Sequence, residues 1–156
     1  MTDRIGRAVG LLFLSTVVIC FATVYLRYAF GAGYIWLQEL YVWTHALTIM
    51  LGGSYCFLKG GFVRIDMFYR NMSDRGKAWV DLFGTLVFMA PFLWMMATYG
   101  WAFFMSSWRM KEGSQYADGL PALYLLKSSY LFFVALMALQ GIAVLLRCAD
   151  TLRSRR

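Results

Sequence analysis

Residues 8–26 read AVGLLFLSTVVICFATVYL, a run of mostly apolar side chains without a charged group. An α-helix rises about 1.5 Å per residue, so this run can cross a hydrocarbon core of about 30 Å. Arg4 and Arg7 precede it, as positive residues precede the apolar part of a signal peptide. However, the run is longer than the usual apolar part of about 7 to 15 residues, and it is followed by Arg27 rather than by the small residues of a cleavage site. We interpret it as a retained membrane anchor.

Three similar runs follow, and the whole composition agrees with them. Of the 156 residues, 61% are hydrophobic, 19% are aromatic and only 15% are charged, which is too apolar for a water-soluble domain of this size. We therefore predict an all-α integral membrane protein, with residues 1–156 forming one domain. Its four transmembrane helices are expected at residues 8–26, 40–58, 82–105 and 123–146.

The positive charges predict the orientation of these helices. Eleven of the fifteen lysines and arginines lie at the two termini or in the connector between the second and third runs. Positive residues favour the cytoplasmic side, so both termini and this connector are expected in the cytoplasm. The protein would be a multi-pass protein of the bacterial inner membrane, with its other two connectors in the periplasm.

Several local features refine this expectation. The aromatic-rich segment 28–37 and the mixed segment 62–68 are typical of chain that lies in the membrane interface. Ser73 is expected to cap the third helix, with Asp74 in its first turn. Pro91 is expected to kink or loosen that helix, either for packing or as a hinge.

Composition and spacing argue against catalysis. His45 is the only histidine, so this chain alone cannot hold haem between two histidines. Cys20, Cys56 and Cys148 are too widely spaced for a metal or redox motif, and no phosphate-binding glycine loop or activated nucleophile is recognisable. We expect no enzyme, no catalytic residue, no metal site and no cofactor in this chain. The charge of +7 forms no basic stripe, which argues against nucleic acid.

Polar residues near membrane depth are the sharpest functional candidates, because they need partners there. Glu39 could form a structural pair with Arg27, dock another subunit, or bind a translocated ion. His45 lies six residues later, about 120° around the helix, so the two do not share a face. We expect His45 to form a hydrogen bond with another helix, and Lys127 to extend toward the periplasmic interface.

A set of short segments resembles a known family. These segments are Arg27-Tyr28, Trp36, Gln38-Glu39-Leu40, Gly52-Gly53 and Val63-Arg64-Ile65-Asp66-Met67-Phe68-Tyr69. Together they resemble the small permease subunit of tripartite ATP-independent periplasmic (TRAP) transporters. Later segments, including Ser106-Ser107-Trp108, Gly119-Leu120-Pro121 and Leu139-Gln140-Gly141, are similar to the mannitol/chloroaromatic branch. Arg64 stands where many small subunits have histidine.

The resemblance implies a role in a three-part importer. A periplasmic binding protein would capture an organic acid, and a large permease subunit would move it with sodium, which binds that partner rather than this chain. The small subunit would scaffold the large one as a stable heterodimer, contact membrane lipids and dock the binding protein transiently. Structural or subunit-interface candidates are Arg27, Trp36, Glu39, Trp43, His45, Arg64 and Asp66. Docking candidates with exposed mixed charge are Arg109, Lys111, Glu112 and Asp118.

Two other classes of function remain open from the residues alone. An autonomous, oligomeric ion-coupled transporter would use Glu39 for coupling, would transport without a partner, and would lose transport in Glu39→Gln. A membrane anchor for a redox enzyme would carry pigment or depend on quinone. The single histidine weighs against the second of these.

Overall fold

The computed structural model describes residues 2–59, 61, 69 and 71–153, and it confirms the all-α prediction for them. The elements are α1 (Thr2–Phe30), α2 (Ile35–Leu58), α4 (Asp74–Gly84), the π-helix η1 (Thr85–Met89), α5 (Ala90–Met110) and α6 (Leu123–Arg153). Because α4, η1 and α5 follow one another without a break, they form one rod of 37 residues, about 55 Å long.

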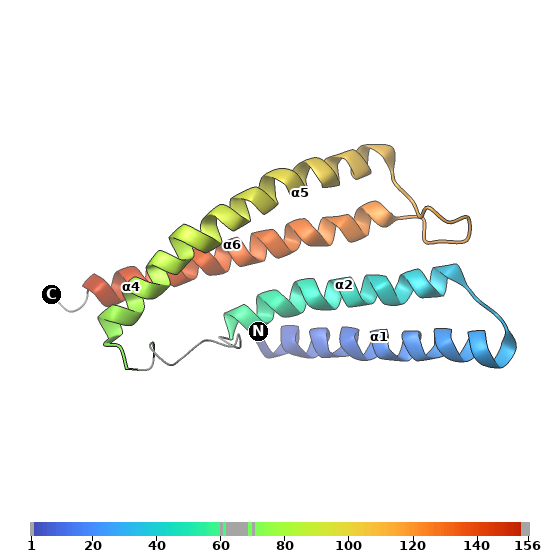
Figure 1. Ribbon diagram of the computed structural model, residues 1–156, viewed down its shortest axis with the longest axis horizontal. Helices are drawn as coiled ribbons and strands as arrows, with labels where there is room; N and C mark the ends of the chain where they lie inside the picture. Colours follow the sequence, from blue (N-terminus) through green and yellow to red (C-terminus); the bar gives the residue numbers. More distant parts are fainter. Residues whose placement is uncertain (1, 60, 62–68, 70, 154–156) are drawn as a thin grey trace.

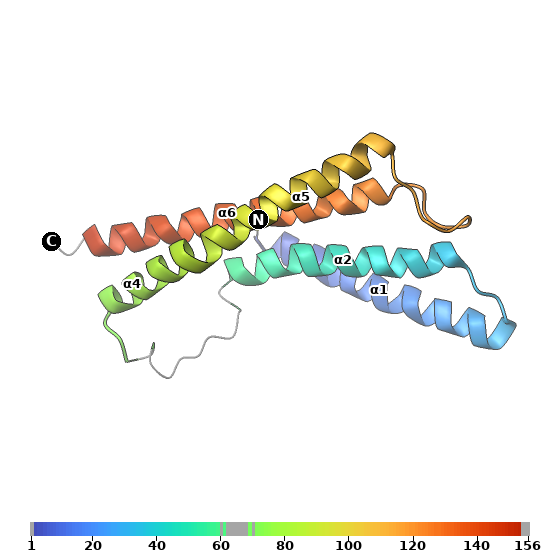
Figure 2. The same cartoon turned by 45° about the horizontal axis from the view of Figure 1, so that its top comes forward.

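The helices form an open row rather than a closed bundle. α1 packs against α2, α2 against α6, and α6 against the rod of α4, η1 and α5 (Figure 1). Figure 2 shows the rod crossing α6 at an angle. The buried apolar residues in the described part of the chain are few: Ala78, Leu93, Val134 and Cys148. Broad apolar faces therefore remain on the surface, where lipid or another membrane protein must cover them.

The connectors alternate between the two ends of the row. The turn at residues 31–34 and the loop at residues 111–122 lie at one end, here called the loop end (Figure 1). The start of α4 and the end of α6 lie at the other, here called the terminus end, and the start of α1 lies between the two ends. The two connectors at the loop end are those that the charge pattern predicts to face the periplasm, and that orientation stays a prediction.

Three of the described helical stretches are long and apolar enough to cross a membrane. They are Gly6–Phe30, Asp74–Met110 and Leu123–Arg153, which contain the predicted first, third and fourth spans. α2, with 24 residues, is not one of these stretches, and it carries Gln38, Glu39 and His45. The fourth crossing therefore stays a prediction.

Small residues bring α1 and α2 close together. A side chain added at Gly6 would collide with the hydroxyl of Tyr55, whereas nothing lies within 4 Å of the same position at Gly10. Further along, the hydroxyls of Thr16 and Thr44 form a hydrogen bond of 2.9 Å between the two helices. Such close approach and interhelical hydrogen bonding stabilise helix pairs in lipid.

The long rod shows the expected cap and an unexpected irregularity. The Ser73 hydroxyl accepts a 3.3 Å hydrogen bond from the backbone of Gly76, and Asp74 lies in the first turn, as predicted. Ahead of Pro91, the backbone N–H of Ala90 donates to the carbonyl of Thr85, five residues back. This π-turn accommodates the missing proline donor, so the rod continues through Pro91.

Segment 28–37, which the sequence predicts to lie in the membrane interface, contains the end of α1 and the start of α2. α1 continues through Phe30 and α2 begins at Ile35, which leaves a turn of four residues. Gly31 makes the reversal feasible because its φ of 64° is in the left-handed region. The other expected interfacial segment, 62–68, lies outside the described residues, as do Arg64 and Asp66.

Candidate functional site at the loop end

Glu39 fixes the loop at residues 111–122 to the start of α2. Its carboxylate accepts a 2.6 Å hydrogen bond from the backbone N–H of Leu120 and a second hydrogen bond from the hydroxyl of Ser114. Hydrogen bonds to a carboxylate are stronger than those between neutral groups. One side chain of α2 therefore positions a loop that is more than seventy residues away in the sequence.

The loop is closed on itself around this carboxylate. The backbone N–H of Ser114 donates to the carbonyl of Leu120 at 3.0 Å, and the N–H of Gly119 donates to the carbonyl of Tyr116 at 3.1 Å. A Cβ atom at Gly119 would overlap the Ser114 side chain and would lie 2.8 Å from the Glu39 carboxylate. We call Glu39, Ser114, Gly119 and Leu120 the Glu39 clasp.

The expected ion pair between Arg27 and Glu39 is not formed. Arg27 is exposed in the last turn of α1, and within the described residues it makes no ion pair. Trp36, which is 44% exposed, has its ring 6.2 Å from that of Tyr34. The Glu39 carboxylate therefore finds its partners in the loop that precedes α6, not in α1.

A second polar contact joins the loop to α6. The ammonium of Lys127 lies 2.5 Å from the carboxylate of Glu112, and both side chains are partly buried. The same ammonium lies 4.1 Å from the centre of the Phe103 ring, within cation–π range. Lys127 therefore joins α5, α6 and the loop, where the sequence had suggested only extension toward the interface.

The contact between Glu112 and Lys127 has a predictable pH dependence. The hydrogen bond from Lys127 lowers the pKa of Glu112 below its ordinary value of 4.5. Because the folded-state pKa is depressed, the stabilisation is fully present above that ordinary value and is lost as the pH falls through the lowered one. We expect Glu112→Gln to lower the melting temperature of the detergent-solubilised chain modestly at pH 7.

The same pH series contains its own control. The difference between the wild type and Glu112→Gln should disappear at low pH, because the wild-type carboxyl is then also neutral. Asp118→Asn removes an exposed charge from the same loop and should leave the profile unchanged. A Glu112→Gln difference that persists undiminished into acid would contradict the ion-pair account.

The four docking candidates divide into two kinds. Lys111 lies over the rings of Trp108 and Tyr124, at 4.3 and 5.0 Å from their centres, and Glu112 binds Lys127. Arg109 and Asp118 are exposed, and the structure shows no ion pair for either within its described part. All but Glu112 are exposed, and contacts with neighbouring side chains hold Lys111 and Glu112 in place.

A groove of about 420 Å³ runs between α2 and α6 beside the clasp. Its lining combines apolar, aromatic and polar side chains: Ile35, Gln38, Glu39, Tyr41, Val42, Trp43, Tyr116, Leu123 and Leu126. Trp43 is therefore a groove residue. His45, two residues further along α2, is exposed, and the structure shows no hydrogen bond for it among the described residues. The expected bond from His45 to another helix of this chain is not formed there.

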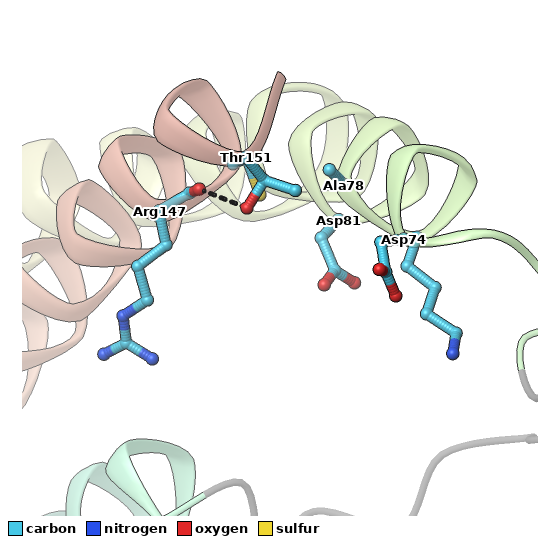
Figure 3. A pocket seen from close by; sticks show the side chains of 7 residues that line it. Asp74, Ala78, Asp81, Arg147 and Thr151 are labelled. Atoms are coloured by element: carbon cyan, nitrogen blue, oxygen red, sulfur yellow. Dashed lines mark hydrogen bonds between the residues drawn. The ribbon is translucent and has the colours of Figure 1, made fainter. Parts of the chain in front are cut away.

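The terminus end has a charged groove of similar volume between α4 and α6 (Figure 3). Asp74 and Asp81 project from α4 and Arg147 from α6, while Lys77 completes a balanced set of charges. Asp81 also accepts a 2.8 Å hydrogen bond from the hydroxyl of Tyr69. With equal numbers of acidic and basic groups, this groove has no strong preference for either sign of ligand.

The described residues contain no group of three or more histidine, cysteine, aspartate or glutamate side chains that could hold a metal ion. The three cysteines are free, and only Cys148 is buried. The polar contacts that we find at the loop end fix a loop to helices. These contacts can hold the exposed surface of the loop in a fixed position.

These features define the class as a helical membrane protein with wide apolar faces and a fixed polar loop at one end. The family model for the DctQ component of tripartite ATP-independent periplasmic transporters matches residues 16–151. The chain therefore belongs to this family, and it is a component of that kind of transporter. Comparison with individual curated proteins returned no match.

Proposed function

We propose that this chain is the non-catalytic small membrane subunit that supports the large permease subunit of its transporter. The observation that carries the proposal is the open row of helices, in which few apolar residues are buried and large ones cover the surface. Such faces require lipid or protein cover. A large permease with its own transmembrane helices would cover one of them and gain a fixed frame against which its moving part slides.

The proposed arrangement has four membrane crossings. The crossing by α2 is the one that is not among the three stretches long and apolar enough by composition. At about 1.5 Å per residue, its 24 residues extend about 36 Å, enough for a core of about 30 Å. The terminus end would lie in the cytoplasm, as the excess of lysine and arginine indicates. The loop end would then face the periplasm of a bacterial inner membrane.

In this arrangement the loop end contributes to docking of the periplasmic binding protein. Arg109, Lys111 and Asp118 are exposed there, and exposed charges steer transient encounters. The Glu39 clasp would hold the loop ready for this contact. We further propose sodium-driven import of an organic acid, with substrate and sodium bound by the large subunit, and membership of the mannitol/chloroaromatic branch.

The contacts of Glu39 weigh against an autonomous transporter that couples through this residue. The carboxylate is occupied by a backbone N–H and a hydroxyl at one end of the helix row. A coupling carboxylate must release these donors and bind an ion during each cycle. We therefore assign Glu39 to loop positioning.

Uptake into membrane vesicles tests the proposal. Vesicles would contain this chain, the large permease or both, with the purified binding protein added outside, an inward sodium gradient imposed, and a panel of radiolabelled organic acids supplied. We expect uptake only when all three components are present. Uptake by this chain alone, particularly uptake abolished by Glu39→Gln, would overturn the subunit assignment in favour of an autonomous transporter.

A further inference from the structure

His45 lies at a depth where an exposed polar side chain is unfavourable. It follows the start of α2 by ten residues, which corresponds to about 15 Å along the helix axis. If α2 crosses the membrane as proposed above, the imidazole lies within the hydrocarbon core. The side chain is exposed, and it has no hydrogen bond within the residues that the structure describes.

The neighbours of His45 on α2 form a continuous exposed face. Val42 and Ile49 precede and follow it by about one turn, and they are 50% and 54% exposed. Toward the loop end this face joins the groove of about 420 Å³ between α2 and α6, in which Gln38 and Leu126 take part. A polar side chain thus lies at the border of a mixed polar and apolar groove.

Exposed faces on α1 and α6 lack this feature. On α1, Leu14, Val18 and Phe21 are exposed and entirely apolar, as lipid contact requires. On α6, Phe132 and Leu139 are exposed and apolar in the same way. Hydrocarbon would satisfy those faces, but it offers no hydrogen-bond partner to an imidazole. Unlike these two faces, the face around His45 therefore needs a protein partner that can form a hydrogen bond with the imidazole.

We propose that the face formed by Val42, His45 and Ile49, together with the adjoining α2–α6 groove, is where a transmembrane helix of the large permease subunit packs. The partner helix carries a hydrogen-bonding group opposite the imidazole and places an apolar side chain in the groove. This inference rests on the proposed function, because it names the face that the large subunit covers. Polar groups inside such contacts fix helix register as well as adding affinity.

Site-specific photocrosslinking locates the covered face. A benzophenone amino acid is placed at Val42 or Ile49, and, as controls of similar exposure, at Val18 on α1 or Leu139 on α6. Each variant is co-expressed with the large permease in native membranes and irradiated. We expect the Val42 and Ile49 positions to crosslink to the large subunit at several times the yield of the control positions.

The outcomes separate the two proposals. Crosslinks to the large subunit from Val18 or Leu139 alone would place the contact on another face, while the subunit assignment would stand. Crosslinks from Val42 and Ile49 to a second copy of this chain would overturn this inference in favour of a homo-oligomer. If the unmodified chain fails to retain a large permease on purification, the proposed function itself fails.

Substitution of His45 tests the hydrogen bond separately. His45→Leu suits lipid better than histidine does, so the isolated chain should fold and melt at the same temperature or higher. We expect the same variant to reduce retention of the large subunit in detergent about tenfold, and we expect His45→Asn, which keeps hydrogen-bonding capacity, to retain most of it. Unchanged or improved retention in His45→Leu would show that no polar partner meets this residue.

Discussion

Glu39→Ala is expected to release the loop at residues 111–122 from α2 and to weaken docking of the binding protein about tenfold or more. The substitution leaves the N–H of Leu120 and the hydroxyl of Ser114 without their acceptor. Loss of a partner from such groups costs about 1–3 kcal/mol, which should free the part of the loop around Ser114 and Leu120 from α2. Hydrogen exchange of the loop amides and binding-protein titration of the assembled transporter measure the two effects.

A second substitution, in the loop rather than in α2, is expected to disrupt the same Glu39 clasp. Gly119→Ala introduces a Cβ atom that would overlap Ser114 and approach Glu39 to 2.8 Å, so it should reproduce the faster exchange. Ala117→Ser, an exposed change in the same loop, serves as the control. Slow loop exchange that persists in both Glu39→Ala and Gly119→Ala would contradict the assignment of Glu39 as the residue that positions the loop.

Gly100→Ala is expected to separate α5 from α6. Gly100 is buried against Tyr130, whose hydroxyl donates a 3.1 Å hydrogen bond to the backbone carbonyl of Met96. A Cβ atom at Gly100 would overlap the Tyr130 ring, so the ring or the helix must move. Such overpacking costs about 1–3 kcal/mol. Thermal unfolding in detergent should show the loss as a clearly lower melting temperature.

The chain offers a matched control for this prediction. Gly10 is also a helical glycine, but nothing lies within 4 Å of the position that its Cβ would take. Gly10→Ala should therefore be neutral or slightly stabilising, because alanine favours the helix. Tyr130→Leu should relieve part of the defect in Gly100→Ala. Equal melting temperatures for Gly100→Ala and Gly10→Ala would show that the close approach at Gly100 is not needed.

Much of the fold follows from patterns that are local in sequence. Apolar runs of sufficient length predicted the helices, and the residue types at Ser73 and Asp74 predicted the start of the rod. The π-turn at Thr85–Met89 was not predicted, because Pro91 dictates only that a backbone donor is missing, and packing against α6 determines how the helix adjusts. The row order of the helices likewise depends on contacts between distant segments.

The site was less predictable because its partners include backbone groups. Glu39 was a sound candidate as a carboxylate near membrane depth, and Arg27 was the obvious partner of opposite charge. In the structure the partner is instead the backbone N–H of Leu120. Almost every residue has a backbone N–H, so the sequence does not indicate which one will bind the carboxylate. Lys127 and Glu112 are fifteen residues apart on different elements, so the sequence did not predict their ion pair either.

Purification of the tagged chain from gently solubilised native membranes, followed by native mass spectrometry, tests the central claim most directly. We expect a complex that contains one copy of this chain and one copy of a many-helix permease subunit. Proteomic analysis of the same sample should identify that partner as the large TRAP component. Recovery of this chain as a homo-oligomer without such a companion would contradict the account.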